Sequence, residues 1–288
     1  MDIDIERALD DAFARATTRA GATVAALVAL TQLVSAVGID TEQAFLQRRL
    51  FEQLALLFDT SVSELVAETN VEFARGPLAL PGSVPHWYGS LLLFLGSILG
   101  IVASLVALRT FTGDRKTTVD RSAFRRLGVA TLNALVGSIV FTFAVGTGLF
   151  LLLLPGIFLL VSLYFYTAFI AIEDQNFVEA FRSSWALTKG RRLAAFVFLV
   201  LVYVVNIVAS ALTTVVTIVF DGLATTGGTG AFQLGGTASP VARLLSIGIH
   251  SLGALFVLAL TAVVFDQFRD LQVATDDDFD GIDEDLLP

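Results

Sequence analysis

Leu127 to Ile172 reads LGVATLNALVGSIVFTFAVGTGLFLLLLPGIFLLVSLYFYTAFIAI, and none of these 46 residues is Asp, Glu, Lys, Arg or His. A helix needs roughly 20 apolar residues to cross a hydrocarbon core of about 30 Å. The stretch is therefore long enough for two spans, and the Pro155-Gly156 pair inside it is typical of a hairpin turn. The sequence predicts an all-α fold, a polytopic integral membrane helical bundle.

The other charge-free runs complete the set of spans. Apolar residues make up 55% of the chain, charged residues only 16%, and the mean hydropathy is +0.78; in a soluble protein about a quarter of the residues are charged. A re-entrant hairpin over 128–172 is an alternative to two full crossings. We predict a single transmembrane domain over residues 1–271, with six spans at about 20–39, 88–108, 128–153, 156–172, 194–219 and 244–265.

Basic residues set the predicted orientation of these spans. If the N-terminus lies inside, the inner segments hold 14 of the 18 Lys and Arg residues. Multi-pass proteins place most of the basic residues of their short loops on the cytoplasmic side. We therefore expect a protein of the cell (plasma) membrane with cytoplasmic N- and C-termini. The outer basic residues are then Arg48, Arg49, Arg75 and Arg243.

The segments outside the spans differ in character. The loop 40–87 has helical periodicity over 42–58 and a capping box at Ser61–Glu64, which together predict an outer helical loop. The tail 272–288 is acidic, and we expect it to be disordered and cytoplasmic. It opens like a calcium-binding loop at Asp276, but Leu287 stands where the bidentate Glu is needed. The acidic excess and the preference for Arg over Lys favour a salt-adapted, archaeal and halophilic source.

The sequence contains no recognisable catalytic or metal-binding motif. It has no cysteine and only two histidines, His86 and His250, which are far apart. No nucleophile elbow, zincin motif, phosphate-binding loop or dinucleotide fingerprint occurs. We therefore predict no enzymatic activity, no cofactor, no metal and no nucleic-acid partner. Proton- and ion-coupled transporters usually keep ionisable groups inside the membrane, and the predicted spans contain no Asp, Glu, Lys or Arg.

A few polar residues remain within the predicted spans. The most prominent are Asn133, Asn206 and His250. Each side chain can form hydrogen bonds between helices, worth about 0.6–2 kcal/mol. The alternative for Asn133 and Asn206 is a substrate-binding polar patch, and the alternative for His250 is a proton relay. We treat them as candidate intramembrane polar residues.

A short amphipathic helix is predicted on the inner side, between the fourth and fifth spans. Phe177, Phe181 and Trp185 recur at helical spacing on one face, and the polar residues lie off that face. Gly190 is expected to end the helix. The candidate contacts with the membrane or a partner protein are Phe177, Phe181, Arg182, Trp185, Lys189, Arg191 and Arg192.

Residues in and before this helix match a longer pattern: a P-G-[IF] turn, an acidic residue about 18 positions later, and an A-[LF]-x-x-S-[WF]-x-L-[TV]-x-G helix. The matching positions are Pro155, Gly156, Glu173, Ala180, Phe181, Ser184, Trp185, Leu187, Thr188 and Gly190. Over 150–195 the chain thus resembles the membrane domain found beside glycerophosphoryl diester phosphodiesterases and related six-span prokaryotic membrane proteins of unknown function. The resemblance implies an integral membrane protein that organises or acts on lipid and envelope components. It implies no catalytic residues, and we expect no phosphodiesterase domain because the chain continues only about 20 residues past the last span.

Three functional hypotheses follow. The first is a non-enzymatic membrane protein that organises lipids, anionic ones included, or a membrane partner protein through its inner helix and basic loops. The second is a transporter or permease subunit for a small or lipidic solute, which would require a polar cavity joining Asn133, Asn206 and His250. The third, a membrane-embedded enzyme, is disfavoured because no acid–base cluster is evident. The oligomeric state is left open.

Overall fold

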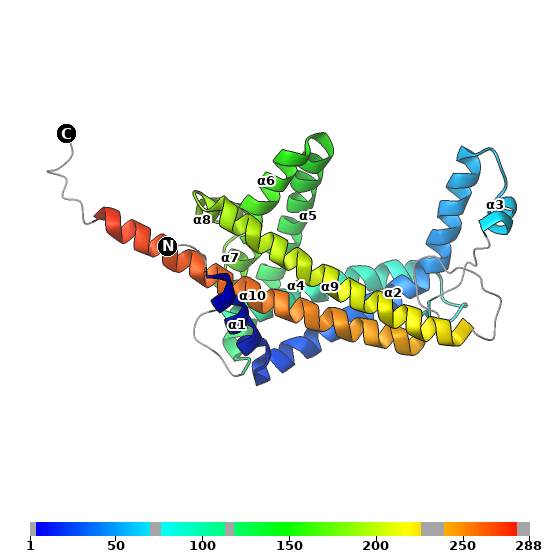
Figure 1. The fold of residues 1–288 in the computed structure, drawn as a ribbon, viewed down its shortest axis with the longest axis horizontal. Coiled ribbons are helices and arrows are strands. Elements are labelled where there is room, and N and C mark those ends of the chain that lie inside the picture. The colour runs from blue at the N-terminus through cyan, green and yellow to red at the C-terminus, as the bar shows by residue number, and fades with distance from the viewer. Residues whose placement is uncertain (1–3, 70–75, 113–117, 226–238, 281–288) are drawn as a thin grey trace. The chain divides into compact units, whose positions relative to one another are not determined.

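The computed structural model describes residues 4–69, 76–112, 118–225 and 239–280. Within these residues the secondary structure is helical, without strands. Six helical segments are long and apolar enough to cross a membrane: Arg19–Gln43, Trp87–Phe111, Leu127–Leu151, Leu153–Glu173, Arg192–Phe220 and Pro240–Val273. The structure therefore confirms the predicted all-α, six-span polytopic architecture (Figure 1).

The charge-free stretch that predicts the hairpin folds as two packed helices, α5 (Leu127–Leu151) and α6 (Leu153–Leu163). The chain turns at Leu152, which is extended with φ −152° and ψ 111°, and not at Pro155-Gly156. Pro155 lies in the first turn of α6, where its missing N–H costs nothing. Gly156 instead lets the two helices meet, because a Cβ atom there would lie 2.4 Å from the backbone nitrogen of Leu149.

The predicted span 156–172 is not one continuous helix. It consists of α6 and a second helix, α7 (Tyr166–Glu173), with an irregular step at Tyr164 and Phe165 between them. A short helix, α8 (Phe177–Thr188), follows and packs against both. The prediction of an amphipathic helix at this place in the chain agrees with α8.

Two predicted boundaries differ because helices run further than hydropathy indicates. Helix α2 (Arg19–Leu57) continues through the predicted end at residue 39, so the periodic stretch 42–58 extends a span and forms no separate helix. Helix α10 (Pro240–Asp280) likewise continues into the predicted disordered tail, of which residues 281–288 lie outside the described residues. Extending an existing helix avoids the cost of nucleating a new one.

The loop after α2 contains the predicted capping box. The side-chain oxygen Oε2 of Glu64 accepts from the Ser61 N–H at 3.1 Å, and the Ser61 hydroxyl accepts from the Glu64 N–H at 3.2 Å. This reciprocal pair opens α3 (Val62–Thr69), as the sequence predicts. The chain returns toward the membrane in α4 (Trp87–Phe111).

The chain divides into two compact units. Unit 1 comprises Met1–Ala26, Ile101–Val205 and Ala254–Pro288, and unit 2 comprises Leu27–Gly100 and Asn206–Gly253. Among the described residues, the basic residues predicted to lie inside fall in unit 1, and Arg48, Arg49 and Arg243, predicted outside, fall in unit 2. Arg75, Arg115 and Lys116 lie outside the described residues. The cations predicted inside and those predicted outside therefore fall in different units, and the orientation itself stays a prediction.

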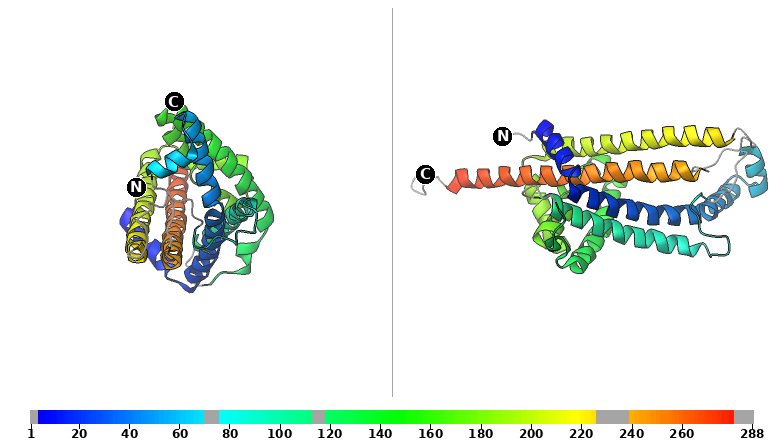
Figure 2. Two further views of the ribbon diagram at one scale, coloured as in Figure 1. Left: turned by 90° about the vertical axis from the view of Figure 1, so that its right-hand side faces the viewer. Right: turned by 90° about the horizontal axis from the view of Figure 1, so that it is seen from below.

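Unit 1 begins with a helix that the span pattern does not predict. Helix α1 (Ile5–Ala16) starts after Asp4, whose side chain accepts from the N–H of Arg7. It lies against α10 in both Figure 1 and Figure 2, and Ala8 and Ala12 are buried. The cap at Asp4 and the spacing of Ile5, Ala8 and Ala12 are the sequence signals for this helix.

Candidate functional site

Helix α8 carries most of the residues singled out from the sequence. It begins at an Asn176 cap, whose side-chain oxygen accepts from the backbone N–H groups of Val178 and Glu179. Just after its end Gly190 has φ +82°, a left-handed conformation that favours glycine. Ala180, Ser184 and Thr188 are fully buried and share one side of the helix. Arg182 and Lys189 are exposed.

The buried hydroxyls of α8 complete the hydrogen bonding of the broken membrane helix. The Ser184 hydroxyl accepts from the Phe165 N–H at 3.1 Å and donates to the Ser162 carbonyl at 3.0 Å. The Thr188 hydroxyl also reaches that carbonyl, at 3.3 Å. An irregular step inside a span is tolerated only where other protein groups satisfy its backbone. Ser184 and Thr188 therefore stabilise the step between α6 and α7.

The predicted aromatic face of α8 packs on neighbouring helices of unit 1. The Phe181 ring lies 4.9 Å from that of Tyr166, and Phe177 lies edge-on to Phe181 at 6.3 Å. Trp185 contacts Phe158 edge-on at 5.3 Å. The Arg192 guanidinium lies over both of these rings, 4.4 Å from Phe158 and 5.0 Å from Trp185. Contact of this face with lipid or a partner protein stays a prediction.

Other arginines of unit 1 bind backbone carbonyls at the predicted inner ends of the helices. Arg15 donates to the carbonyl of Phe111, the last residue of α4, and to Asp266 at 3.2 Å. Arg109 donates to the Ala171 carbonyl in the last turn of α7 and to Asp174 at 2.7 Å. Arg125 also pairs with Asp174, at 2.6 Å. A cation near a helix C-terminus also complements the helix dipole.

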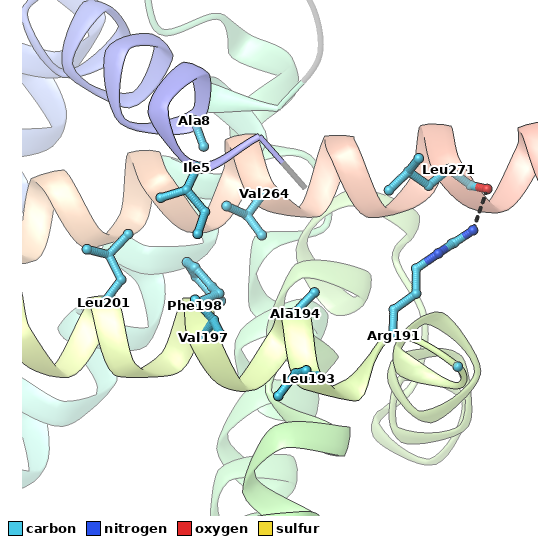
Figure 3. Close-up of a pocket in the computed structure, with 11 residues that line it drawn as sticks. Ile5, Ala8, Arg191, Leu193, Ala194, Val197, Phe198, Leu201, Val264 and Leu271 are labelled. Carbon is cyan, nitrogen blue, oxygen red and sulfur yellow. Dashed lines mark hydrogen bonds between the residues drawn. The ribbon is translucent and has the colours of Figure 1, made fainter. Parts of the chain in front are cut away.

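An apolar cavity of about 360 Å³ lies within unit 1, beside the start of α9 (Arg192–Thr225). Its walls come from α1, α9 and α10, and Arg191 stands at one end, donating to the Leu271 carbonyl at 2.8 Å (Figure 3). Lys189 lies two residues before Arg191 in the chain, and Arg192 follows it directly. The apolar wall consists of Ile5, Ala8, Leu193, Ala194, Val197, Phe198, Leu201 and Val264.

A second, smaller cavity lies within unit 2, and we call it the polar cavity because six of its nine lining residues are polar. Its volume is about 230 Å³, and its walls come from α2, α9 and α10. The Thr213 hydroxyl lies 3.1 Å from Nδ1 of His250. The lining residues are Gln32, Ser35, Ala36, Ile39, Thr213, Arg243, Ser246, Ile247 and His250.

Of the three predicted intramembrane polar residues, only His250 is a lining residue of this cavity. Asn133, in unit 1, donates to the Val129 carbonyl one turn earlier in its own helix, at 3.0 Å. Asn206 lies exposed on α9. The cavity is lined instead by hydroxyl and amide side chains. A prediction of spans from hydropathy gives these residues little weight, because they only lower the mean hydropathy of an apolar helix slightly.

A buried ion pair joins Asp40 to Arg243, which lines the polar cavity. The Asp40 carboxylate is nearly fully buried; one oxygen meets Nη2 of Arg243 at 2.8 Å, and the other accepts from the Leu78 N–H at 3.0 Å. The Leu80 N–H likewise donates to the neighbouring Thr41 hydroxyl. These contacts attach the loop before α4 to α2. Sequence reasoning missed the pair because each residue lies at the edge of a span, where charges are usual.

Among the described residues, no group of three or more His, Asp or Glu side chains could hold a metal ion. The sequence model of a family described as a domain of unknown function (DUF7847) matches residues 3–271, so the chain belongs to that family. No curated protein and no solved structure matches the chain. None of these comparisons links it to the membrane domain found beside glycerophosphoryl diester phosphodiesterases, so that resemblance stays a prediction.

Proposed function

We propose that this member of the DUF7847 family is a non-enzymatic protein of the cell membrane that binds anionic phospholipids at its cytoplasmic side and thereby organises lipid or envelope components. The observation that carries the proposal is the apolar cavity of unit 1, which ends at Arg191 (Figure 3). An acyl chain in the cavity and a headgroup phosphate near Lys189, Arg191 and Arg192 would match this pattern. The 14-to-4 distribution of basic residues supports placing this end in the cytoplasm.

The charge of the basic residues, and not the apolar wall of the cavity, would determine the selectivity for anionic over zwitterionic lipid. A lipid chain gains little by moving from the bilayer to the cavity, because lipid tails are as apolar as the side chains that line it. A basic residue near the headgroups contributes about 1 kcal/mol toward anionic lipid. Three such residues would favour anionic over zwitterionic lipid by up to about 3 kcal/mol, roughly a hundredfold.

Lipid retention tests the proposal directly. The protein would be reconstituted into nanodiscs containing equal amounts of phosphatidylglycerol and phosphatidylcholine, extracted in mild detergent and weighed by native mass spectrometry. We expect phosphatidylglycerol to remain bound at fixed stoichiometry. Lys189→Gln should reduce this retention by up to about fivefold, because Lys189 is exposed and its substitution changes charge and no buried contact.

A matched pair of cavity variants separates chain binding from surface charge. Ala194 lines the cavity on α9, so Ala194→Phe should fill it and displace the bound lipid. Ala211→Phe places the same side chain at an exposed position on α9, in unit 2, and should leave retention unchanged. Equal retention of the two lipids, or full retention in Ala194→Phe, would contradict the proposal.

Transport of a small or lipidic solute is a second candidate function. The observation that favours it is the polar cavity around His250 in unit 2, since a solute path needs polar groups within the spans. Proteoliposomes loaded with a fluorescent phospholipid would test lipid movement. Transfer between leaflets at a rate that depends on the protein would favour this candidate over static lipid binding.

A further inference from the structure

The polar cavity of unit 2 is built mainly from side chains that hydrocarbon does not tolerate unpaired. Gln32, Ser35, Thr213, Arg243, Ser246 and His250 supply most of its lining. Polar groups inside a membrane protein normally satisfy one another or face an aqueous or ligand-filled space. Some of these do pair, since Ser246 donates to the Ala242 carbonyl at 2.8 Å and Thr213 contacts His250.

Arg243 is the exception within the cavity wall. Its Nη2 meets Asp40, but its Nε is buried and has no hydrogen-bond partner among the described residues. Leaving a buried donor unsatisfied costs about 1–3 kcal/mol. The Nε atoms of Arg15 and Arg192 share this property, but neither of these residues lines the polar cavity. Of these three arginines, Arg243 alone lines a cavity that hydroxyl, amide and imidazole side chains also line, and its side chain keeps 21% of its surface exposed.

The charges around the cavity select the sign of a ligand. Arg243 lines the wall, whereas no Asp or Glu does. Asp40 is held away by its contacts with Arg243 and the Leu78 N–H, so it orients the guanidinium without lining the cavity. Fixed donors that need no reorganisation bind an anion at the lowest entropic cost. A cation would meet the guanidinium with no lining carboxylate to balance it.

We propose that this cavity is a binding site for a small oxyanion, a phosphate or carboxylate group, held by the guanidinium of Arg243 and the neighbouring hydroxyl and imidazole groups. The volume of about 230 Å³ limits the ligand to a small molecule or to the headgroup of a lipid. Both sources present the same chemistry to Arg243. The site is independent of the lipid cavity proposed above, because every lining residue belongs to unit 2.

Isothermal titration of the detergent-solubilised full chain with inorganic phosphate, and separately with acetate, tests the site. We expect saturable one-to-one binding of at least one probe. Arg243→Gln combined with Asp40→Asn should weaken it at least tenfold, and the double change avoids an unpaired buried carboxylate. Thr213→Val should weaken it several-fold without changing charge. Arg48→Gln removes an exposed cation from α2 of the same unit and should leave the affinity unchanged.

Nanodiscs distinguish the two sources of the anion. If phosphate binds equally in discs of phosphatidylcholine and of phosphatidylglycerol, the site takes a free anion. If phosphatidylglycerol blocks phosphate binding and the double variant removes that block, the occupant is a lipid headgroup. Both outcomes support the site. Absence of saturable binding of either probe in detergent and in both kinds of disc, with the wild-type protein folded, would overturn it and leave the lipid proposal for unit 1 untouched.

Discussion

The two units use arginine in different ways. In unit 1, Arg15 and Arg109 each donate to a backbone carbonyl as well as to a carboxylate, and Arg191 donates to a carbonyl of α10. In unit 2, Arg243 pairs with the buried carboxylate of Asp40, which also holds a loop N–H. A backbone carbonyl that loses its arginine partner is neutral and leaves no buried charge. If either partner of the Asp40–Arg243 ion pair is replaced, the other is left as a buried, uncompensated charge. The comparison predicts which unit tolerates the loss of a cation.

The largest effect is expected from breaking the ion pair of unit 2. Arg243→Ala should lower the free energy of unfolding by about 3–5 kcal/mol, because it leaves Asp40 buried and uncompensated. Thermal unfolding in detergent would show the loss. Hydrogen exchange would place it in unit 2, with faster exchange at Leu78, whose N–H donates to Asp40.

The double variant Asp40→Asn, Arg243→Gln sharpens this test. Neutral amides of similar size keep hydrogen-bonding capacity without a buried charge, so the double variant should be more stable than Arg243→Ala. If the two lose equal stability, the damage comes from packing around Arg243 and not from the orphaned carboxylate. The contrast between the units would then be incorrect.

A smaller effect is expected from the corresponding change in unit 1. Arg109→Ala removes contacts with Ala171, Ala123 and Asp174, but Asp174 keeps its pairing with Arg125. We expect a loss of about 2–3 kcal/mol in the free energy of unfolding. Arg121→Ala, at an exposed position of unit 1, is the control and should change stability by less than about 0.5 kcal/mol. A loss at Arg109 larger than that at Arg243 would reverse the comparison.

A hydroxyl in unit 1 should matter less than either arginine. Ser184→Ala removes the partner of the Phe165 N–H, which we expect to cost about 1–2 kcal/mol of unfolding free energy, because the Thr188 hydroxyl still reaches the Ser162 carbonyl. Ser183→Ala is the matched control, one residue away and only partly buried. Thermal unfolding of the two variants side by side provides the measurement. Equal stability would show that another group satisfies the step between α6 and α7.

The sequence predicted the fold through quantities that do not depend on tertiary contacts. The charge-free stretch Leu127–Ile172 and the basic bias require only bilayer thickness and the cost of moving charge into it. The sequence predicted the turn at Pro155-Gly156, whereas the chain turns at Leu152. The prediction was wrong because Pro155 is compatible with the first turn of a helix as well as with a break. Such boundaries depend on local geometry that composition does not record.

The candidate sites were less predictable. Phe181 and Trp185 follow from helical periodicity, but the roles of Ser184 and Thr188 depend on the step in a helix about 20 residues earlier in the chain. The pairing of Asp40 with Arg243 joins residues about 200 positions apart. Span analysis treats both as ordinary boundary charges. Only tertiary structure shows that they meet, and that Gln32, Ser35 and His250 share a cavity with Arg243.

The smallest expected effect concerns an exposed polar contact of unit 2. Its removal provides a lower limit for the stability losses that are compared between the two units. Hydrogen bonds from the Thr60 hydroxyl and from the N–H and hydroxyl of Ser61 hold the pKa of the Glu64 carboxyl below its ordinary value of 4.5. Because the folded pKa is the lower one, this stabilisation is present above the ordinary pKa and is lost as pH falls through the folded pKa. Nuclear magnetic resonance titration of Glu64 should give a pKa below 4.5, and Ser61→Ala should raise it toward that value.

Glu64→Gln should leave global thermal unfolding unchanged, because α3 is a short helix opened by this cap. A Glu64 pKa at or above 4.5 would show that the capping box does not form in solution, and a global loss of stability in Glu64→Gln would show that polar contacts in unit 2 need not be buried to matter.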